Sequence, residues 1–157
     1  MKYFSTRNKS IEFSFKDIFL RGLAPDGGLF LPSEIKRYSG SELKNLSKLS
    51  YVDLATEIIF NFCKEDIDKD QLKIILEKSY GNFKSKDVVE LKKIGNHNLL
   101  ELYKGPTLAF KDIAMQVIGN MYDYLEVSKN KVVNILVATS GDTGSAAISA
   151  LNDRKNI

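Results

Sequence analysis

Two short segments of the sequence carry residue types that could perform covalent and anion-binding chemistry. In the first, residues 105–112, Lys111 directly follows the apolar run Leu108-Ala109-Phe110. Loss of water around a lysine amine favours the neutral form, which attacks carbonyl groups. The second, residues 138–144, is a glycine-punctuated turn between an apolar run and a predicted helix, where backbone N–H groups can hold a phosphate or carboxylate. Together they predict an enzyme that holds a carbonyl cofactor on Lys111 through a Schiff base.

Neither segment satisfies a nucleotide-binding motif. Residues 105–112 supply the first glycine and the lysine of a Walker loop, but Phe110 and Asp112 stand where a glycine and a hydroxyl residue are required. Gly141 and Gly144 provide a Gly-x-x-Gly pattern without the third glycine of a dinucleotide fingerprint. A nucleotide- or phosphate-binding α/β enzyme is therefore the weaker alternative.

Each segment also has a plainer interpretation. Most lysines are solvated surface charges, and Lys111 alone would be read that way. Its place after an apolar triplet and at the start of a predicted helix favours the reactive interpretation, because burial and the helix dipole both disfavour an ammonium there. The loop at Ser140 and Gly141 can be an ordinary turn in which Asp142 or Thr143 caps the next helix. A capping loop can also face a ligand, so the two interpretations are compatible.

Composition argues against a nucleic-acid-binding protein, a membrane protein and a metal-binding protein. The chain has 157 residues, 43% of them apolar, and a formal net charge of +3 from 23 basic and 20 acidic residues. Charges of both signs are interspersed, and no basic cluster carries regularly spaced aromatic residues, so we predict no nucleic-acid partner. The start lacks the apolar run of a signal peptide and no segment is long enough to span a bilayer, which predicts a cytoplasmic protein with no membrane partner. Cys63 and His97 are each the single residue of their type, so no metal site is predicted.

The hydrophobic pattern predicts a mixed α/β chain. The run 132–138 is apolar almost throughout, as in a strand buried on both faces of a parallel sheet, and the helix-then-strand order before it is typical of a βαβ unit. Such a sheet needs more strands than this chain offers. The other predicted strands are 3–6, 29–31, 88–91 and 99–103, and the predicted helices are 15–23, 51–63, 69–80, 112–125 and 143–151.

A change in character near the glycine-rich turn at residue 95 predicts a domain boundary. Residues 1–95 are expected to form a small N-terminal α/β region. Residues 96–157 are expected to hold the first elements of a second, incomplete α/β domain that carries both chemical segments.

Three motifs resemble those of the threonine synthase family. They are residues 22–32 (GLAPDGGLFLP), residues 105–112 (GPTLAFKD) and residues 138–144 (ATSGDTG), in the family's order and spacing. The resemblance implies a pyridoxal-phosphate enzyme of fold type II, the tryptophan synthase β type, whose Phe-Lys-Asp lysine holds the cofactor. By that match the lysine is Lys111.

The same resemblance assigns roles to the loop residues. In the family the Ser-Gly-Asp-Thr-Gly loop holds the substrate's α-carboxylate and lies against the cofactor ring, which implies substrate binding by Ser140, Gly141, Asp142 and Thr143 and a cofactor contact by Asp142. The implied reaction converts O-phosphohomoserine and water to L-threonine and phosphate.

Family members are longer than this chain, so the resemblance implies an N-terminal fragment. The groups that hold the cofactor phosphate and the pyridine nitrogen are then expected beyond Ile157, and the fragment alone is expected to be inactive and to self-associate. An inactive folding or interaction module is the non-enzymatic alternative.

Overall fold

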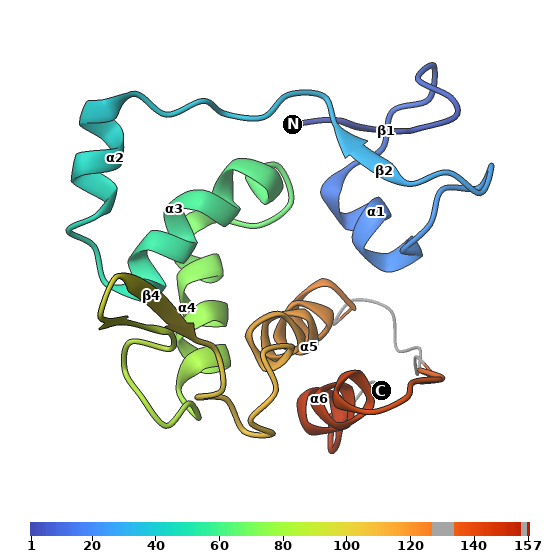
Figure 1. Ribbon diagram of the computed structural model, residues 1–157. Helices are drawn as coiled ribbons and strands as arrows, with labels where there is room; N and C mark the ends of the chain where they lie inside the picture. The colour runs from blue at the N-terminus through green and yellow to red at the C-terminus, as the bar shows by residue number, and fades with distance from the viewer. Residues whose placement is uncertain (127–133, 155–156) are drawn as a thin grey trace. The chain divides into compact units, whose positions relative to one another are not determined.

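The computed structural model describes residues 1–126, 134–154 and 157 of the chain. Backbone contacts divide it into two compact units, Met1–Ile74 and Ile75–Ile157. Figure 1 colours the chain from blue at the N-terminus to red at the C-terminus. In the part of the chain that is described, no helix combines the length and the apolar character that a bilayer crossing requires.

The first unit contains a two-stranded antiparallel sheet and three complete helices. Strand β1 (Tyr3–Ser5) pairs with β2 (Phe30–Pro32), with Tyr3 opposite Pro32. Each helix starts after a serine whose side chain accepts a hydrogen bond from the backbone N–H three residues later, the usual N-cap arrangement. The helices are α1 (Phe15–Arg21), α2 (Gly40–Leu46) and α3 (Tyr51–Cys63).

Helix α2 is not among the predicted helices. At seven residues it is too short to show an apolar period, and none of its residues is buried. Its sequence signal is the capping box of Ser39 and Glu42, in which each side chain bonds the backbone N–H of the other residue.

Helix α4 (Lys69–Tyr80) runs across the boundary between the two units. Ion pairs join its first turns to α3, from Lys69 to Glu57 at 2.5 Å and from Lys73 to Asp53 at 2.8 Å. The predicted helices 51–63 and 69–80 are confirmed as α3 and α4.

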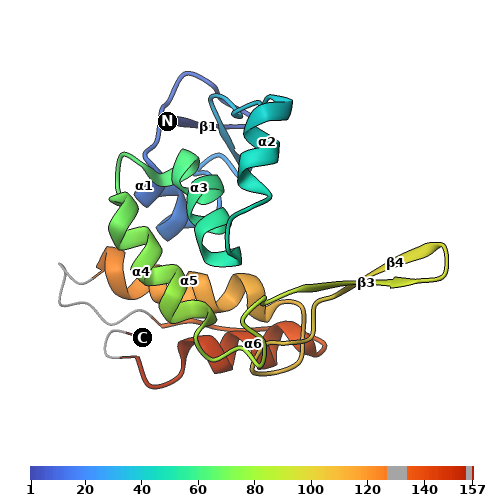
Figure 2. The ribbon, with the colours of Figure 1, turned by 90° about the vertical axis from the view of Figure 1, so that its left-hand side faces the viewer.

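The second unit holds the two chemical segments. Strands β3 (Glu90–Ile94) and β4 (His97–Glu101) form a hairpin around Gly95, whose φ of +59° favours glycine. Figure 2 shows this hairpin extending away from the two helices of the unit, α5 (Asp112–Glu126) and α6 (Asp142–Leu151). The buried apolar residues of the unit are Ile75, Leu76, Tyr80, Val88, Ala109, Val117, Met121, Leu125, Ala146, Ala147 and Ala150.

The predicted strand 132–138 is not formed in the described part of that segment, residues 134–138. Residues 132 and 133 lie outside the described residues, and 134–138 are exposed and unassigned to any strand. A strand needs a neighbour for its N–H and C=O groups. The two sheets of the described residues are separate antiparallel pairs, so nothing there offers that neighbour. The mixed α/β class and the incomplete sheet are confirmed. The predicted boundary after residue 95 falls in the hairpin turn and stays a prediction.

Candidate active site

Helices α5 and α6 pack side by side and run in the same direction. Gln116 Nε2 donates to Ser149 Oγ at 3.4 Å, and further along the chain Asp123 of α5 forms an ion pair with Arg154, three residues after the end of α6. Because the contacting positions advance together, the two helices are parallel and their N-termini lie at one end of the unit, as Figure 2 shows. This end carries Lys111, which immediately precedes α5, and the loop that starts α6.

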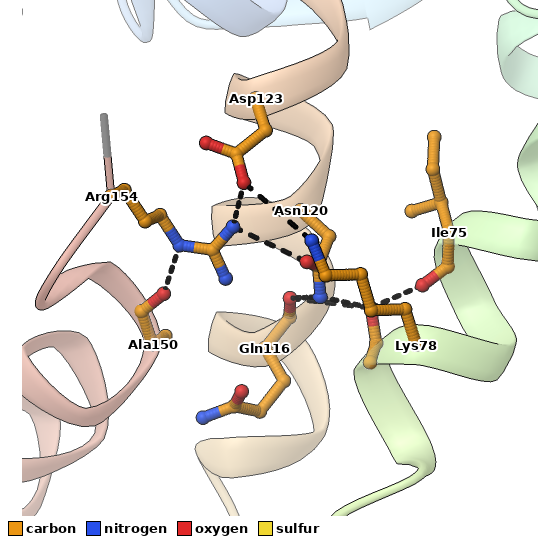
Figure 3. A network of polar contacts seen from close by, with 8 residues as sticks. Ile75, Lys78, Gln116, Asn120, Asp123, Ala150 and Arg154 are labelled. Atoms are coloured by element: carbon orange, nitrogen blue, oxygen red, sulfur yellow. Dashed lines mark hydrogen bonds and ion pairs between the residues drawn. The ribbon is translucent and has the colours of Figure 1, made fainter. Parts of the chain in front are cut away.

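The C-terminal halves of these helices are joined through Arg154 (Figure 3). Its Nε donates to the Ala150 carbonyl, its Nη1 donates to Asn120 Oδ1 at 3.2 Å, and the same nitrogen pairs with Asp123. The Lys78 amine also lies 3.9 Å from the Asp123 carboxylate. A guanidinium on a late carbonyl of α6 offsets the partial negative charge of that helix end.

Buried hydrogen bonds tie α4 to α5 beside this ion pair. The single hydroxyl proton of Ser79 is shared between the carbonyls of Ile75, at 2.6 Å from Oγ, and of Gln116, at 3.2 Å, and Oγ accepts from Asn120 Nδ2 at 2.9 Å. Buried polar groups that are all bonded favour one arrangement of the helices over others. The position of α5 in the unit is therefore set from both sides.

Gly119 permits the close approach of α5 and α6. A Cβ atom at this position would lie 2.5 Å from the Ala150 carbonyl oxygen and 2.9 Å from a guanidinium nitrogen of Arg154. Any larger residue must displace one helix from the other. The spacing of the two helix starts consequently depends on a glycine at position 119.

Lys111 is half-buried, and its amine lies 4.3 Å from the centroid of the Phe110 ring. The prediction that Leu108, Ala109 and Phe110 exclude water from the Lys111 amine is wrong for this structure. Leu108 and Phe110 are 54% and 56% exposed, and Ala109 alone of the three is buried. Alternate side chains of this loop point outward from a turn in which Leu108 has φ of +65°. An ammonium is attracted to an aromatic face, so Phe110 holds the Lys111 amine at the surface of the unit.

The loop before α6 is open to solvent. Residues 134–142 are exposed and Thr143 is half-buried. Gly144 is needed here, since a Cβ atom on it would lie 2.4 Å from Thr139 Cγ2. The N-cap is Gly141, with no side-chain cap, so the interpretation of Asp142 or Thr143 as the cap is wrong.

The first N–H groups of an α-helix lack a partner four residues earlier and can bind an anion. In α6 the Gly144 N–H donates instead to the Gly141 carbonyl at 2.9 Å, so the N–H groups of Asp142 and Thr143 are the candidates. The structure thus places Ser140, Gly141, Asp142 and Thr143 around a helix N-terminus that can accept a carboxylate. It brings them to the same end of the unit as Lys111. The shared end, with two positive helix N-termini and one lysine, is suited to a ligand that carries acidic groups.

A cluster of charged residues secures the strand that leads into the Lys111 loop. Glu101, which is almost fully buried, lies 3.0 Å from the Lys92 amine and 3.1 Å from the Lys104 amine, and Lys104 also lies 3.1 Å from Glu90. A hydrogen bond from Tyr103 and those of the two lysines lower the pKa of Glu101 to about 2. The carboxylate therefore stays ionised at neutral pH and closes the base of the β3–β4 hairpin.

Asp112 and Thr107, which were not predicted as site residues, lie in the loop 105–112 together with Lys111. Asp112 is fully buried and both of its carboxylate oxygens accept hydrogen bonds from Thr107. Both residues are visible in the 105–112 motif, but a loop that folds back on itself leaves no periodic signal in the sequence. The Gly-Pro start of the segment, a pair typical of turns, is the one local signal that could have indicated such a loop.

Comparisons with known proteins place the chain in one family. Residues 2–80 match the family model of the threonine synthase N terminus. The threonine synthase of Methylobacillus glycogenes is 42% identical over 167 residues, covering all of this chain and 35% of that protein. A crystal structure of a PLP-bound threonine synthase from Brucella melitensis is 40% identical, with a TM-score of 0.92 over 99% of this chain and 34% of its own. The yeast threonine synthase structure gives 38% identity and the same TM-score over 99% and 34%. The chain spans about a third of the length of these relatives.

Proposed function

This chain belongs to the threonine synthase family, and from that premise we propose that it contributes part of the active site of an enzyme that converts O-phosphohomoserine and water to L-threonine and phosphate. The observation that carries the proposal is the parallel packing of α5 and α6, which puts Lys111 and the loop 140–143 at one end of a unit. The matched relatives are named threonine synthases, and none of those compared favours a nucleotide-binding enzyme. A cytoplasmic location is part of the proposal.

The residues at this end fit one part of pyridoxal phosphate. Lys111 offers a primary amine for its carbonyl group, at the surface of the unit and next to two helix N-termini. When bound, the cofactor supplies an electron sink that stabilises negative charge developing on the substrate. Groups for its phosphate and its ring nitrogen are not assigned to any residue of this chain.

The chain's own residues then have distinct tasks. The first-turn N–H groups of α6, with the hydroxyls of Ser140 and Thr143, bind the substrate's α-carboxylate and fix the orientation of its Cα. Asp142 would contact the cofactor ring when the cofactor is bound. The Lys111 amine, once free, removes the proton at Cα and carries protons to and from Cβ, where water adds after phosphate leaves Cγ.

Phosphate release from O-phosphohomoserine tests this proposal in the complete protein supplied with pyridoxal phosphate. Lys111→Ala is expected to lower turnover by about 10²-fold or more, because it removes the acid–base group. Lys93→Ala, which changes an exposed lysine on the β3–β4 hairpin, is the matched control and is expected to leave turnover unchanged. Normal turnover in Lys111→Ala would refute the proposal, and inactivity of the unaltered protein would favour a folding or interaction module. The 157-residue chain alone is expected to release no phosphate.

A further inference from the structure

Asp112 is a fully buried carboxylate at the first position of α5, directly after Lys111. A buried carboxylate is unfavourable unless its oxygens are hydrogen-bonded. Here Oδ2 accepts from the Thr107 backbone N–H and Oδ1 accepts from the Thr107 hydroxyl, both at 2.8 Å. The positive end of α5 adds to the stabilisation of the charge. Asp112 therefore closes a loop that begins five residues before it.

The rest of the loop is shaped to admit this carboxylate. A Cβ atom on Gly105 would lie 2.4 Å from Asp112 Cβ and 2.5 Å from Oδ2, so only glycine fits at position 105. Within the loop the Leu108 N–H donates to the Gly105 carbonyl at 3.2 Å, and the Asp112 N–H donates to the Ala109 carbonyl at 3.1 Å. The loop is thus closed on itself by side-chain and backbone bonds together.

Leu108 shows that this closure holds the backbone in an unfavourable conformation. Its φ of +65° lies in the left-handed region, which a γ-branched residue rarely adopts. The side chain is 54% exposed, so burial of the leucine does not compensate for the strain. Strain of this kind persists only where neighbouring contacts determine the backbone, and it is concentrated at functional sites.

We propose that Asp112 is a positioning residue for Lys111. Its carboxylate accepts hydrogen bonds from the backbone N–H and the hydroxyl of Thr107 and so fixes the strained loop. The loop in turn sets where Phe110 and the Lys111 amine lie. Asp112 itself touches neither the substrate nor the cofactor. This inference rests on the proposed role of Lys111 and adds the device that presents its amine at the start of α5.

The test measures which lysine pyridoxal phosphate attaches to in the complete protein. After borohydride reduction, peptide mapping gives the ratio of label on Lys111 to label on Lys93, an exposed lysine that serves as the internal control. Thr107→Val removes one of the two bonds to Asp112, and Asp112→Ala removes both. Each is expected to lower the ratio by about tenfold or more, because small displacements of a reacting group cost large factors in rate.

Two conservative variants separate positioning from a general loss of structure. Thr107→Ser keeps the hydroxyl, and Asp112→Asn can still accept from the Thr107 N–H while its amide donates to the rotated hydroxyl. Both are expected to label Lys111 as the unaltered chain does. If Asp112→Ala does not fold, as judged by circular dichroism, Thr107→Val carries the test.

The outcomes distinguish this inference from the function it rests on. An unchanged ratio in Thr107→Val, or a ratio in Asp112→Asn as low as in Asp112→Ala, would overturn the positioning role while leaving Lys111 as the cofactor lysine. No preference for Lys111 in the unaltered complete protein would overturn the proposed function itself, and the inference with it.

Discussion

Replacing Gly119 by alanine is expected to push α6 away from α5 and to destabilise the unit that contains them. The new Cβ would lie 2.5 Å from the Ala150 carbonyl oxygen, whereas an ordinary contact needs at least 3.4 Å, so one helix must move by about 0.9 Å. Overpacking of this kind costs about 1–3 kcal/mol. Alanine regains up to about 1 kcal/mol through its higher helix propensity. If the full amount of about 1 kcal/mol is regained, the expected net loss is up to about 2 kcal/mol.

Urea and thermal unfolding followed by circular dichroism measure this loss, and a fall of about 4–8 °C in Tm is expected for each kcal/mol. Gly40→Ala is the matched control, because Gly40 also lies in a helix and a Cβ atom there would meet nothing within 4 Å. That variant is expected to be neutral or stabilised by about 0.4–1 kcal/mol. A Gly119→Ala protein stabilised as much as Gly40→Ala would refute the close helix contact and with it the spacing of the two helix starts.

Three other outcomes are expected. The folded-state pKa of Glu101 is about 2, below its ordinary 4.5, so the ionised carboxylate stabilises the fold fully above pH 4.5 and this effect is lost as the pH falls towards 2. The Tm should therefore fall more steeply between pH 4.5 and 2 in the unaltered chain than in Glu101→Gln. The same dependence of Tm on pH in both proteins would contradict the ion pairs of Glu101 with Lys92 and Lys104. Burial raises the pKa of the Cys63 thiol to about 12, so a disulfide reagent should modify this thiol only after unfolding. Rapid modification of the native chain would contradict the burial of Cys63 at the end of α3. The apolar residues Leu136 and Ile148 are 97% and 65% exposed and are expected to drive self-association of the chain. Gel filtration with light scattering should show weaker self-association in Leu136→Lys than in the unaltered chain. A monomer at all protein concentrations would disprove this expectation.

The sequence predicts most helices because their signals are local. Ser50 caps α3 and an apolar period runs to Cys63, so the helix 51–63 could be predicted with its exact bounds. The starts of α5 and α6 follow from the motifs that precede them. Short α2 lacks that periodicity and was missed.

The failures arise where structure depends on distant or absent partners. The apolar run 132–138 has strand character, yet its described part has no neighbouring strand with which to pair. The predicted desolvation of Lys111 assumed that three consecutive apolar residues all turn inward. The left-handed turn at Leu108 instead leaves two of them in solvent, and the bond network of Asp112 that accompanies this turn cannot be seen in a linear pattern.

The proposed function requires Lys111 and the loop 140–143 to act on one substrate. The most direct test reduces the complete protein with borohydride in the presence of pyridoxal phosphate, with and without O-phosphohomoserine, and maps the label. We expect label on Lys111 that O-phosphohomoserine removes, since the substrate amine displaces the lysine. In the Ser140→Ala/Thr143→Ala variant the label should persist to substrate concentrations higher by about a hundredfold or more, because each of the two lost hydrogen bonds to a charged group costs about 1.5–3 kcal/mol. Label on another lysine, or equal displacement in both proteins, would contradict this requirement.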